Sequence, residues 1–180
     1  YADGKIKKIS AKVSKLFTRK GKLYAAVDNA LAEIRKGKIK KLMELDSPVV
    51  DISIALDNSM WVITQAKLYL IENGEATPVV DVPEATVCLA AKDNAAKYAE
   101  TVYVGSTVEG LLSMKGKRRH WSELLPDITG VLSKEIKCIS IDALGHLWVG
   151  SDEGLNIYDG RNYWFNGNDF YSVNFDVNCS

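Results

Sequence analysis

The chain has 180 residues, of which 47% are hydrophobic and 26% charged, and its formal net charge is zero. This is the composition of an ordinary globular protein that is long enough to bury a sizeable core. No apolar run approaches the roughly 18 residues that a transmembrane helix needs, so we expect any membrane contact to be made through a tether outside this stretch.

The beginning of the chain is basic. Residues 1–41 carry a net charge of +10 and the remainder carries −10. A basic region can indicate nucleic acid or an anionic membrane as a partner. In GKIKK, however, lysine alternates with isoleucine as in an exposed strand, where lysine discourages edge-to-edge aggregation. We therefore interpret the charge as a solvated face or as an electrostatic match to the acidic part, and expect no nucleic-acid partner.

Four similar units follow one another along the chain. An apolar–aromatic pair marks the second strand of each unit, at Leu23-Tyr24, Met60-Trp61, Val102-Tyr103 and Leu147-Trp148. The aromatic residues are 37, 42 and 45 positions apart, and a leucine and then a glycine turn follow each of them. A period of about 40 residues with several short strands per unit is typical of β-propeller blades. We expect these four aromatic side chains to be buried between neighbouring blades.

The repeat predicts an all-β propeller segment of four-stranded antiparallel blades. The stretch VDNALAEIRKG could form an amphipathic helix, but the repeat register assigns it to a strand. The expected blades cover residues 11–48, 49–85, 86–134 and 135–171. Residues 1–10 are interpreted as the tail of a preceding blade, and residues 172–180 as the first strand of a following blade.

The two partial units do not complete one blade. One is an outer strand and the other an inner strand, and two further strands separate these positions in a blade. We therefore expect that this stretch is not a self-closed propeller. It is interpreted as a fragment of a larger propeller, with two copies that complete each other as the alternative.

The fourth unit, LGHLWVGSDEGLNIYDG, resembles the two-component regulator propeller repeat. The matching positions are Asp142, Gly145, Leu147, Trp148, Val149, Gly150, Gly154 and Leu155, with Ser151 for the usual threonine. The third unit matches at Val104, Gly105, Ser106, Gly110 and Leu111. The second unit has Ile63 where the motif has glycine, and the first keeps little beyond Gly21, Leu23 and Tyr24.

This resemblance implies the extracytoplasmic sensor region of a bacterial two-component regulator, periplasmic or extracellular, which feeds a histidine kinase and often recognises glycans or other nutrients. The expected partners are a small-molecule or glycan ligand, or a protein, together with the remaining blades of the parent protein or a second copy. The alternative is a protein-interaction scaffold of a secretion or cell-surface assembly. A polar and aromatic pocket at the central axis would favour the sensor, and a broad apolar or charged face would favour the scaffold.

The topology of a propeller predicts where a ligand binds. Propellers usually recognise partners with loops at one mouth of the central channel, here including the loops that join second and third strands. The candidate ligand-binding residues in these loops are Asp28, Asn29, Gln65, Glu109, Asp152 and Glu153.

The sequence contains no arrangement that indicates catalysis. His120 and His146 are the only histidines, without metal-ligand spacing and without a Ser/His/Asp arrangement. Asp142 and Gly145 frame a tight turn with too few ligands for calcium. We therefore expect no enzyme, no metal site and no cofactor.

The three cysteines, Cys88, Cys138 and Cys179, lie on the first strands of successive units. Equivalent positions in adjacent blades are usually too far apart for a disulfide. We therefore expect buried free thiols.

Overall fold

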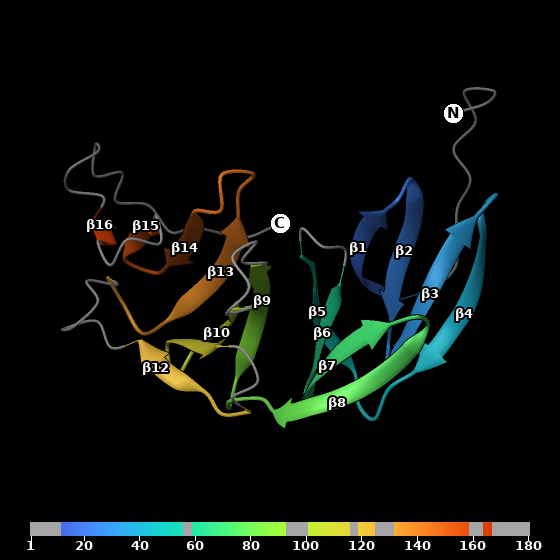
Figure 1. Cartoon of the computed structure of the whole chain (residues 1–180), viewed down its shortest axis with the longest axis horizontal. Helices are drawn as coiled ribbons and strands as arrows, with labels where there is room; N and C mark the ends of the chain where they lie inside the picture. The colour runs from blue at the N-terminus through green and yellow to red at the C-terminus, as the bar shows by residue number, and fades with distance from the viewer. Residues whose placement is uncertain are drawn as a thin grey trace.

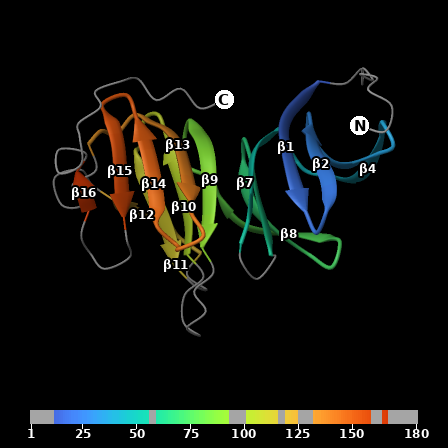
Figure 2. The same ribbon diagram turned by 90° about the horizontal axis from the view of Figure 1, so that it is seen from above.

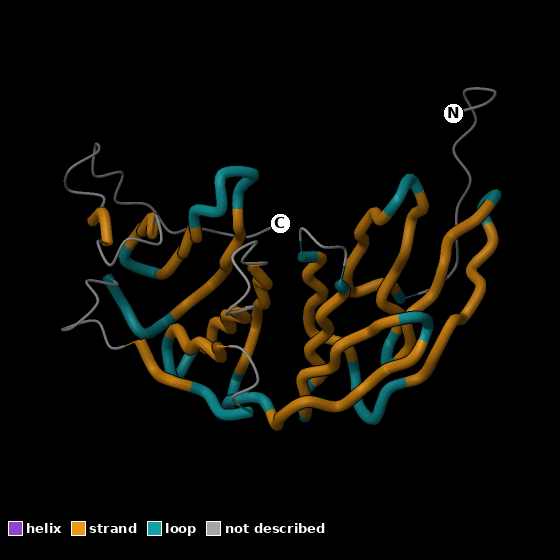
Figure 3. Tube along the Cα trace, viewed as in Figure 1, coloured by secondary structure: helices purple, strands orange, loops and turns teal. Residues whose placement is uncertain are grey.

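The computed structural model describes residues 12–55, 59–92, 101–115, 119–124, 132–158 and 164–166. All regular structure in these residues is strand, and the strands form four antiparallel sheets of four (Figure 3). The all-β fold predicted from the repeat is therefore confirmed. The partial units expected at 1–10 and 172–180 lie outside the described residues.

Each sheet is a meander of four consecutive strands. The first contains β1 (Val13–Arg19), β2 (Lys22–Val27), β3 (Ala30–Arg35) and β4 (Lys38–Glu44). The second contains β5 (Val49–Ile54), β6 (Met60–Thr64), β7 (Lys67–Glu72) and β8 (Glu75–Asp81). The third contains β9 (Thr86–Lys92), β10 (Thr101–Ser106), β11 (Leu111–Lys115) and β12 (Ser122–Leu124). The fourth contains β13 (Ile136–Ile141), β14 (Leu147–Ser151), β15 (Gly154–Tyr158) and β16 (Trp164–Asn166).

Tight turns set the strand boundaries in the first two sheets. In the turn between β7 and β8, Asn73 and Gly74 both have positive φ, at 51° and 86°. This is the backbone of a type I′ turn, whose twist matches that of the flanking strands. The pair Lys36 and Gly37 between β3 and β4 has the same conformation. The ambiguous VDNALAEIRKG stretch is therefore held as a strand by hairpin turns at both of its ends.

The four sheets are arranged as blades around a common axis. In Figure 1 the first strands β1, β5, β9 and β13 lie towards the middle and the last strands lie at the periphery. Adjacent inner strands contact one another in chain order. The sheets form an arc that is open between the fourth sheet and the first, and the view from above shows the first two sheets on one side and the last two on the other (Figure 2).

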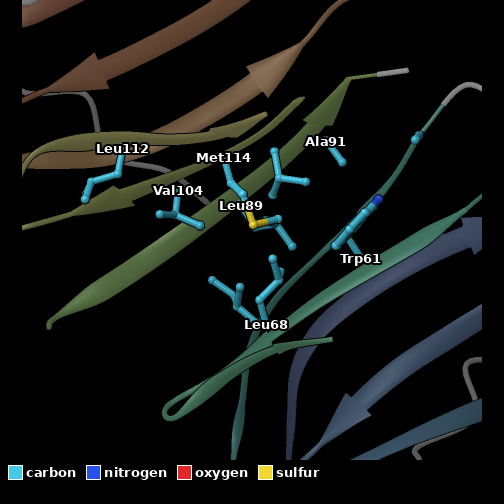
Figure 4. Packing of buried hydrophobic residues seen from close by; sticks show 10 residues of the cluster. Trp61, Leu68, Leu89, Ala91, Val104, Leu112 and Met114 are labelled. Atoms are coloured by element: carbon cyan, nitrogen blue, oxygen red, sulfur yellow. The ribbon is translucent and has the colours of Figure 1, made fainter. Parts of the chain in front are cut away.

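An apolar cluster fills each of the three interfaces between successive sheets. In the first, Ala26 and Leu31 of the first sheet pack with Val62 of the second. The second interface joins Trp61, Ile63 and Leu68 to Leu89, Ala91, Val102, Val104, Leu112 and Met114 (Figure 4). The third joins Cys88, Ala90, Tyr103 and Leu111 to Ile136, Ile139, Leu147 and Val149. Burial of these apolar side chains is the main force that holds blade to blade.

The four marker aromatics are not equally buried. Trp61 and Tyr103 are 3% and 6% exposed, as predicted for side chains between blades. Tyr24 is only half-buried, because its ring stacks on Phe17 at the edge of an open groove. Trp148 is also half-buried. It lies on the face of β14 opposite to Val149, which packs on the third sheet, and the fourth sheet is the last one described.

The expectation of free thiols is right for one cysteine and wrong for another. Cys88 is free and buried in the third interface, where burial and then the charge of Asp51 raise its pKa to about 12. Cys138 is disulfide-bonded. It pairs across strands with Gly150, on the same half-exposed face as Trp148, so its sulfur is not enclosed between two sheets. Cys179 lies outside the described residues.

Candidate functional site

A cavity of about 340 Å³ lies against the inner strands of all four sheets. Lys15 and Phe17 of β1, residues 51–54 of β5 and residues 89–91 of β9 line it, together with residues 139–142 of β13 and the turn that follows. Because one strand of every sheet contributes, the cavity lies at the axis around which the blades are arranged (Figure 1). Its volume is at the lower end of the ~300–1,000 Å³ found for ligand pockets.

A buried carboxylate joins three inner strands at this cavity. Asp51 is 4% exposed, and its Oδ1 forms an ion pair of 2.9 Å with Nζ of Lys15. The same oxygen accepts a hydrogen bond of 2.7 Å from the backbone N–H of Ile52. Its Oδ2 accepts one of 3.0 Å from the backbone N–H of Leu89, across the blade boundary. A buried charge is stable only when it is paired and hydrogen-bonded in this way.

A second polar contact crosses the same boundary two residues further along. Oγ of Ser53 accepts a hydrogen bond of 2.9 Å from the backbone N–H of Ala91. The inner edge of β9 has no strand partner of its own in the sheet, so its N–H groups need acceptors from the neighbouring blade. Asp51 and Ser53 supply them and thereby fix the spacing between β5 and β9.

Phe17 gives the cavity an aromatic wall. Its ring stacks on Tyr24 with 5.2 Å between centroids and 13° between planes. Tyr24 lies on β2, farther from the axis, and Phe17 lies on the inner strand β1 and lines the cavity. The aromatic ring of Phe17, Lys15 and Ser53 therefore line one cavity together.

Asp142, in the turn after β13, also lines the cavity. Its Oδ1 accepts hydrogen bonds from the backbone N–H groups of Leu144 and His146, and its Oδ2 contacts Nδ1 of His146 at 2.9 Å and Nε1 of Trp148 at 3.1 Å. Desolvation opposes ionisation, but the hydrogen bonds from Trp148, His146 and Leu144 outweigh it, so the pKa of Asp142 lies far below its ordinary value. The turn predicted at 142–145 is thus stabilised by hydrogen bonds to the ionised carboxylate of Asp142.

The six residues predicted to bind a ligand lie in four separate turns, one in each sheet. None of them lines the axial cavity. These turns are at the end of the blades opposite to Asp142, because successive strands are antiparallel. Several of them bind the chain that connects one sheet to the next. Asn29 Nδ2 donates to the carbonyl of Leu45, and Oε1 of Glu109 accepts from the backbone N–H of Glu84.

The sequence did contain a signal for the axial site. Asp51 and Ser53 are the two polar residues of VVDISI, the sequence of the innermost strand β5, whose other residues are apolar. A buried strand position that holds a carboxylate needs partners, and those partners lie in other blades. Lys15 and Leu89 are 36 and 38 residues away from Asp51, so the sequence alone does not pair them.

The described residues contain no group of three or more histidine, cysteine or acidic side chains that could hold a metal ion. They also contain no helix that is long and apolar enough to cross a membrane. At the axis, Lys15 is held in its ion pair with Asp51, and Oγ of Ser53 accepts the hydrogen bond from the N–H of Ala91.

The fold is similar to those of the extracellular domains assigned to two hybrid two-component systems of B. thetaiotaomicron, BT4673 and BT3049. For BT4673 the TM-score is 0.64 at 16% identity, over 86% of this chain and 21% of the other. For BT3049 it is 0.66 at 17% identity, over 92% of this chain and 24% of the other. The chain thus spans about a quarter or less of these ectodomains. The likeness agrees, at the level of the fold, with the family resemblance of the repeat.

An enzyme shares the architecture as well. A catalytically inactive variant of virginiamycin B lyase from Staphylococcus aureus aligns with a TM-score of 0.63 at 14% identity, over 89% of this chain and 56% of the lyase. No protein-family model and no curated protein sequence matches the chain. The comparisons therefore establish a propeller fold of the kind used by sensor ectodomains, and the function has to be argued from the site.

Proposed function

We propose that this chain is a run of blades from the extracytoplasmic sensor region of a bacterial two-component regulator, in the periplasm or outside the cell. The similarity to two such ectodomains and the match of the fourth unit to the two-component regulator repeat support this. In this proposal the open arc is continued by further blades of the parent protein, and a kinase reads the state of the propeller.

The proposed activity is the non-catalytic binding of a small molecule or glycan in the axial cavity. The observation that carries it is that Phe17, Lys15 and Ser53 line one cavity at the axis. An aromatic face with fixed polar donors is a common way to bind a polar ring, since the ring plane packs and the donors set its orientation. The loop residues Asp28, Asn29, Gln65, Glu109, Asp152 and Glu153 stay a prediction, for contacts of a longer ligand or of a protein at the other mouth.

A thermal-shift screen against a panel of oligosaccharides tests this proposal. We expect at least one of them to raise the unfolding temperature, because a ligand that binds only the folded state stabilises it. Phe17→Ala should abolish this shift. Leu16→Ala is the matched control, because Leu16 lies on the opposite face of the same strand and is 57% exposed. The scaffold alternative predicts no shift with any oligosaccharide.

A further inference from the structure

A second groove, of about 290 Å³, opens between the first and second sheets, and its lining shares one residue, Phe17, with that of the axial cavity. Tyr24, Leu42 and Met43 line it from the first sheet, and Met60 and Ile71 line it from the second. The turn at 73–74 stands at its edge. Apart from Asn73 in this turn, the side chains that line the groove are apolar or aromatic, so the groove suits the hydrocarbon part of a ligand.

Leu42 is displaced towards the groove by an irregularity in β4. Leu31 pairs with Met43 and Ala32 pairs with Lys41, so Leu42 is an extra residue between two cross-strand pairs. This is the pattern of a β-bulge, a feature that redirects a side chain. As a result Leu42 is 44% exposed, although it lines an apolar groove.

A row of basic residues runs across the first sheet next to this groove. Arg35 pairs with Lys38. Leu23 pairs with Ile34, so the same register continued by one residue brings Lys22 opposite Arg35, and the three residues share one face of the sheet. This is the groove face, since Lys22 is two residues before Tyr24 on the same strand. All three are exposed, and none takes part in an ion pair within the described residues. Like charges placed opposite one another destabilise a sheet, and the ion pairs of the described residues leave this row uncompensated.

The other charged groups nearby do not cancel this row. Glu33 and Lys40 pair with each other across strands in the row of Tyr24. On the second sheet, Glu72 and Glu75 flank the turn at 73–74 and pair with each other. They point to the opposite face of that sheet, because Ile71 points into the groove and neighbouring residues alternate. The edge of the groove is therefore basic.

We propose that this groove binds a small amphipathic anion, with its apolar part between the two sheets and its carboxylate or similar group against Lys22, Arg35 and Lys38. The site goes beyond the axial sensor site of the proposed function. Charge-assisted hydrogen bonds from lysine and arginine would hold the anionic group, and burial of the apolar part would add the hydrophobic contribution. The basic row, which is unfavourable in the empty protein, would then be neutralised in the complex.

The three methionines of the chain make a direct test possible. Met43 and Met60 line the groove, and Met114 is buried in the cluster between the second and third sheets. Decanoate is titrated, below its micelle-forming concentration, into the protein labelled at the methionine methyl groups, and NMR spectra are recorded. We expect saturable shifts of the Met43 and Met60 signals and no change at Met114. Shifts of all three, or of none, would overturn the proposal.

Two further experiments test whether the negative charge of the ligand is needed and whether it binds next to the basic row. Decyltrimethylammonium, with the same chain and the opposite charge, should bind at least tenfold more weakly than decanoate, and equal binding would contradict the proposal. The double variant R35E/K38E should also weaken decanoate binding at least tenfold, whereas K115E should not, because Lys115 occupies the place of Arg35 in the third sheet. Similarly, L42E should prevent binding and L16E should not. All these residues are exposed, and an unchanged Met114 signal verifies that each variant is folded.

Discussion

The second and third interfaces between sheets differ in the residue that the second strand of the blade contributes at one equivalent position. Ile63 in β6 and Gly105 in β10 follow the marker aromatics Trp61 and Tyr103 by two residues. Ile63 is completely buried and fills the second interface. At Gly105 a Cβ atom would come within 2.5 Å of Sγ of Cys88 and within 2.5 Å of Cγ2 of Ile136. In the second interface, the position two residues after the marker aromatic carries a large side chain. In the third interface, the same position has room for glycine only.

The compensating volume is on the inner strand of the next blade. Ile136 pairs with Ser151 in the fourth sheet, as Thr86 pairs with Ser106 in the third. The inner-strand residue that meets the glycine is therefore an isoleucine, and the corresponding position of the third sheet holds the smaller threonine. The comparison teaches that the motif glycine is needed where the next blade brings a large inner-strand residue. Ile63 departs from the motif glycine, but its side chain is accommodated in the second interface, and the second sheet keeps its four strands.

The largest expected effect is in the interface filled from β6. Trp61→Ala should lower the free energy of unfolding by about 3–5 kcal/mol, because it removes a large buried side chain and leaves a cavity. Trp148→Ala is the matched variant in the fourth sheet and should cost clearly less, because that side chain is half-exposed. Urea unfolding measures both. Equal losses would mean that the face of the fourth sheet is covered as well as that of the second.

The third interface should be destabilised when a side chain is added at Gly105, because the site is already closely packed. Gly105→Ala should lower the free energy of unfolding by about 1–3 kcal/mol, since Cys88 and Ile136 would have to move. Adding Cys88→Ala should restore part of the loss, because one of the two close contacts is removed. An unchanged stability of Gly105→Ala would show that the two interfaces do not differ in the way described.

The polar contacts between β5 and β9 distinguish the second interface further. Asp51→Ala leaves the N–H of Leu89 without its acceptor and should cost about 1–3 kcal/mol. Lys15→Ala removes the other half of the ion pair but should cost less, since Lys15 is largely exposed and the N–H contacts of Asp51 remain. Thermal unfolding of the two variants compares them, and a larger loss for Lys15→Ala would contradict this assignment.

The third interface should be sensitive to alkaline pH. The pKa of Cys88 is raised from 9.0 to about 12 in the folded protein, chiefly by burial. The folded state therefore keeps a proton that the unfolded state loses, so stability is full below pH 9 and falls as the pH rises towards 12. At pH 10 the loss is on the order of 1 kcal/mol. Cys88→Ala should show a shallower decline of unfolding temperature between pH 8 and 10; an identical decline would exclude the thiol as its source.

Much of the fold could be predicted because its signals are local. Glycine turns such as Asn73-Gly74 and short apolar runs such as MWVIT depend on neighbouring residues only. The axial site depends on contacts between Lys15, Asp51 and Leu89, which the sequence separates by whole blades. The candidate residues in the mouth loops follow from topology alone, and Asn29 and Glu109 among them are hydrogen-bonded to the segments that connect the sheets. The disulfide of Cys138 depends on a contact with a second cysteine, which no pattern within that unit reveals.

The central claim is that a ligand binds at the axis, among the inner strands of different blades. The most direct measurement is an amide chemical-shift map of the protein, with the oligosaccharide that raises the unfolding temperature most. We expect the largest changes at Ser53, Ala91 and Ser140, which line the cavity from three sheets. Changes confined to the turns of Asp28, Gln65, Glu109 and Asp152 at the opposite mouth, or no binding by any oligosaccharide, would contradict it.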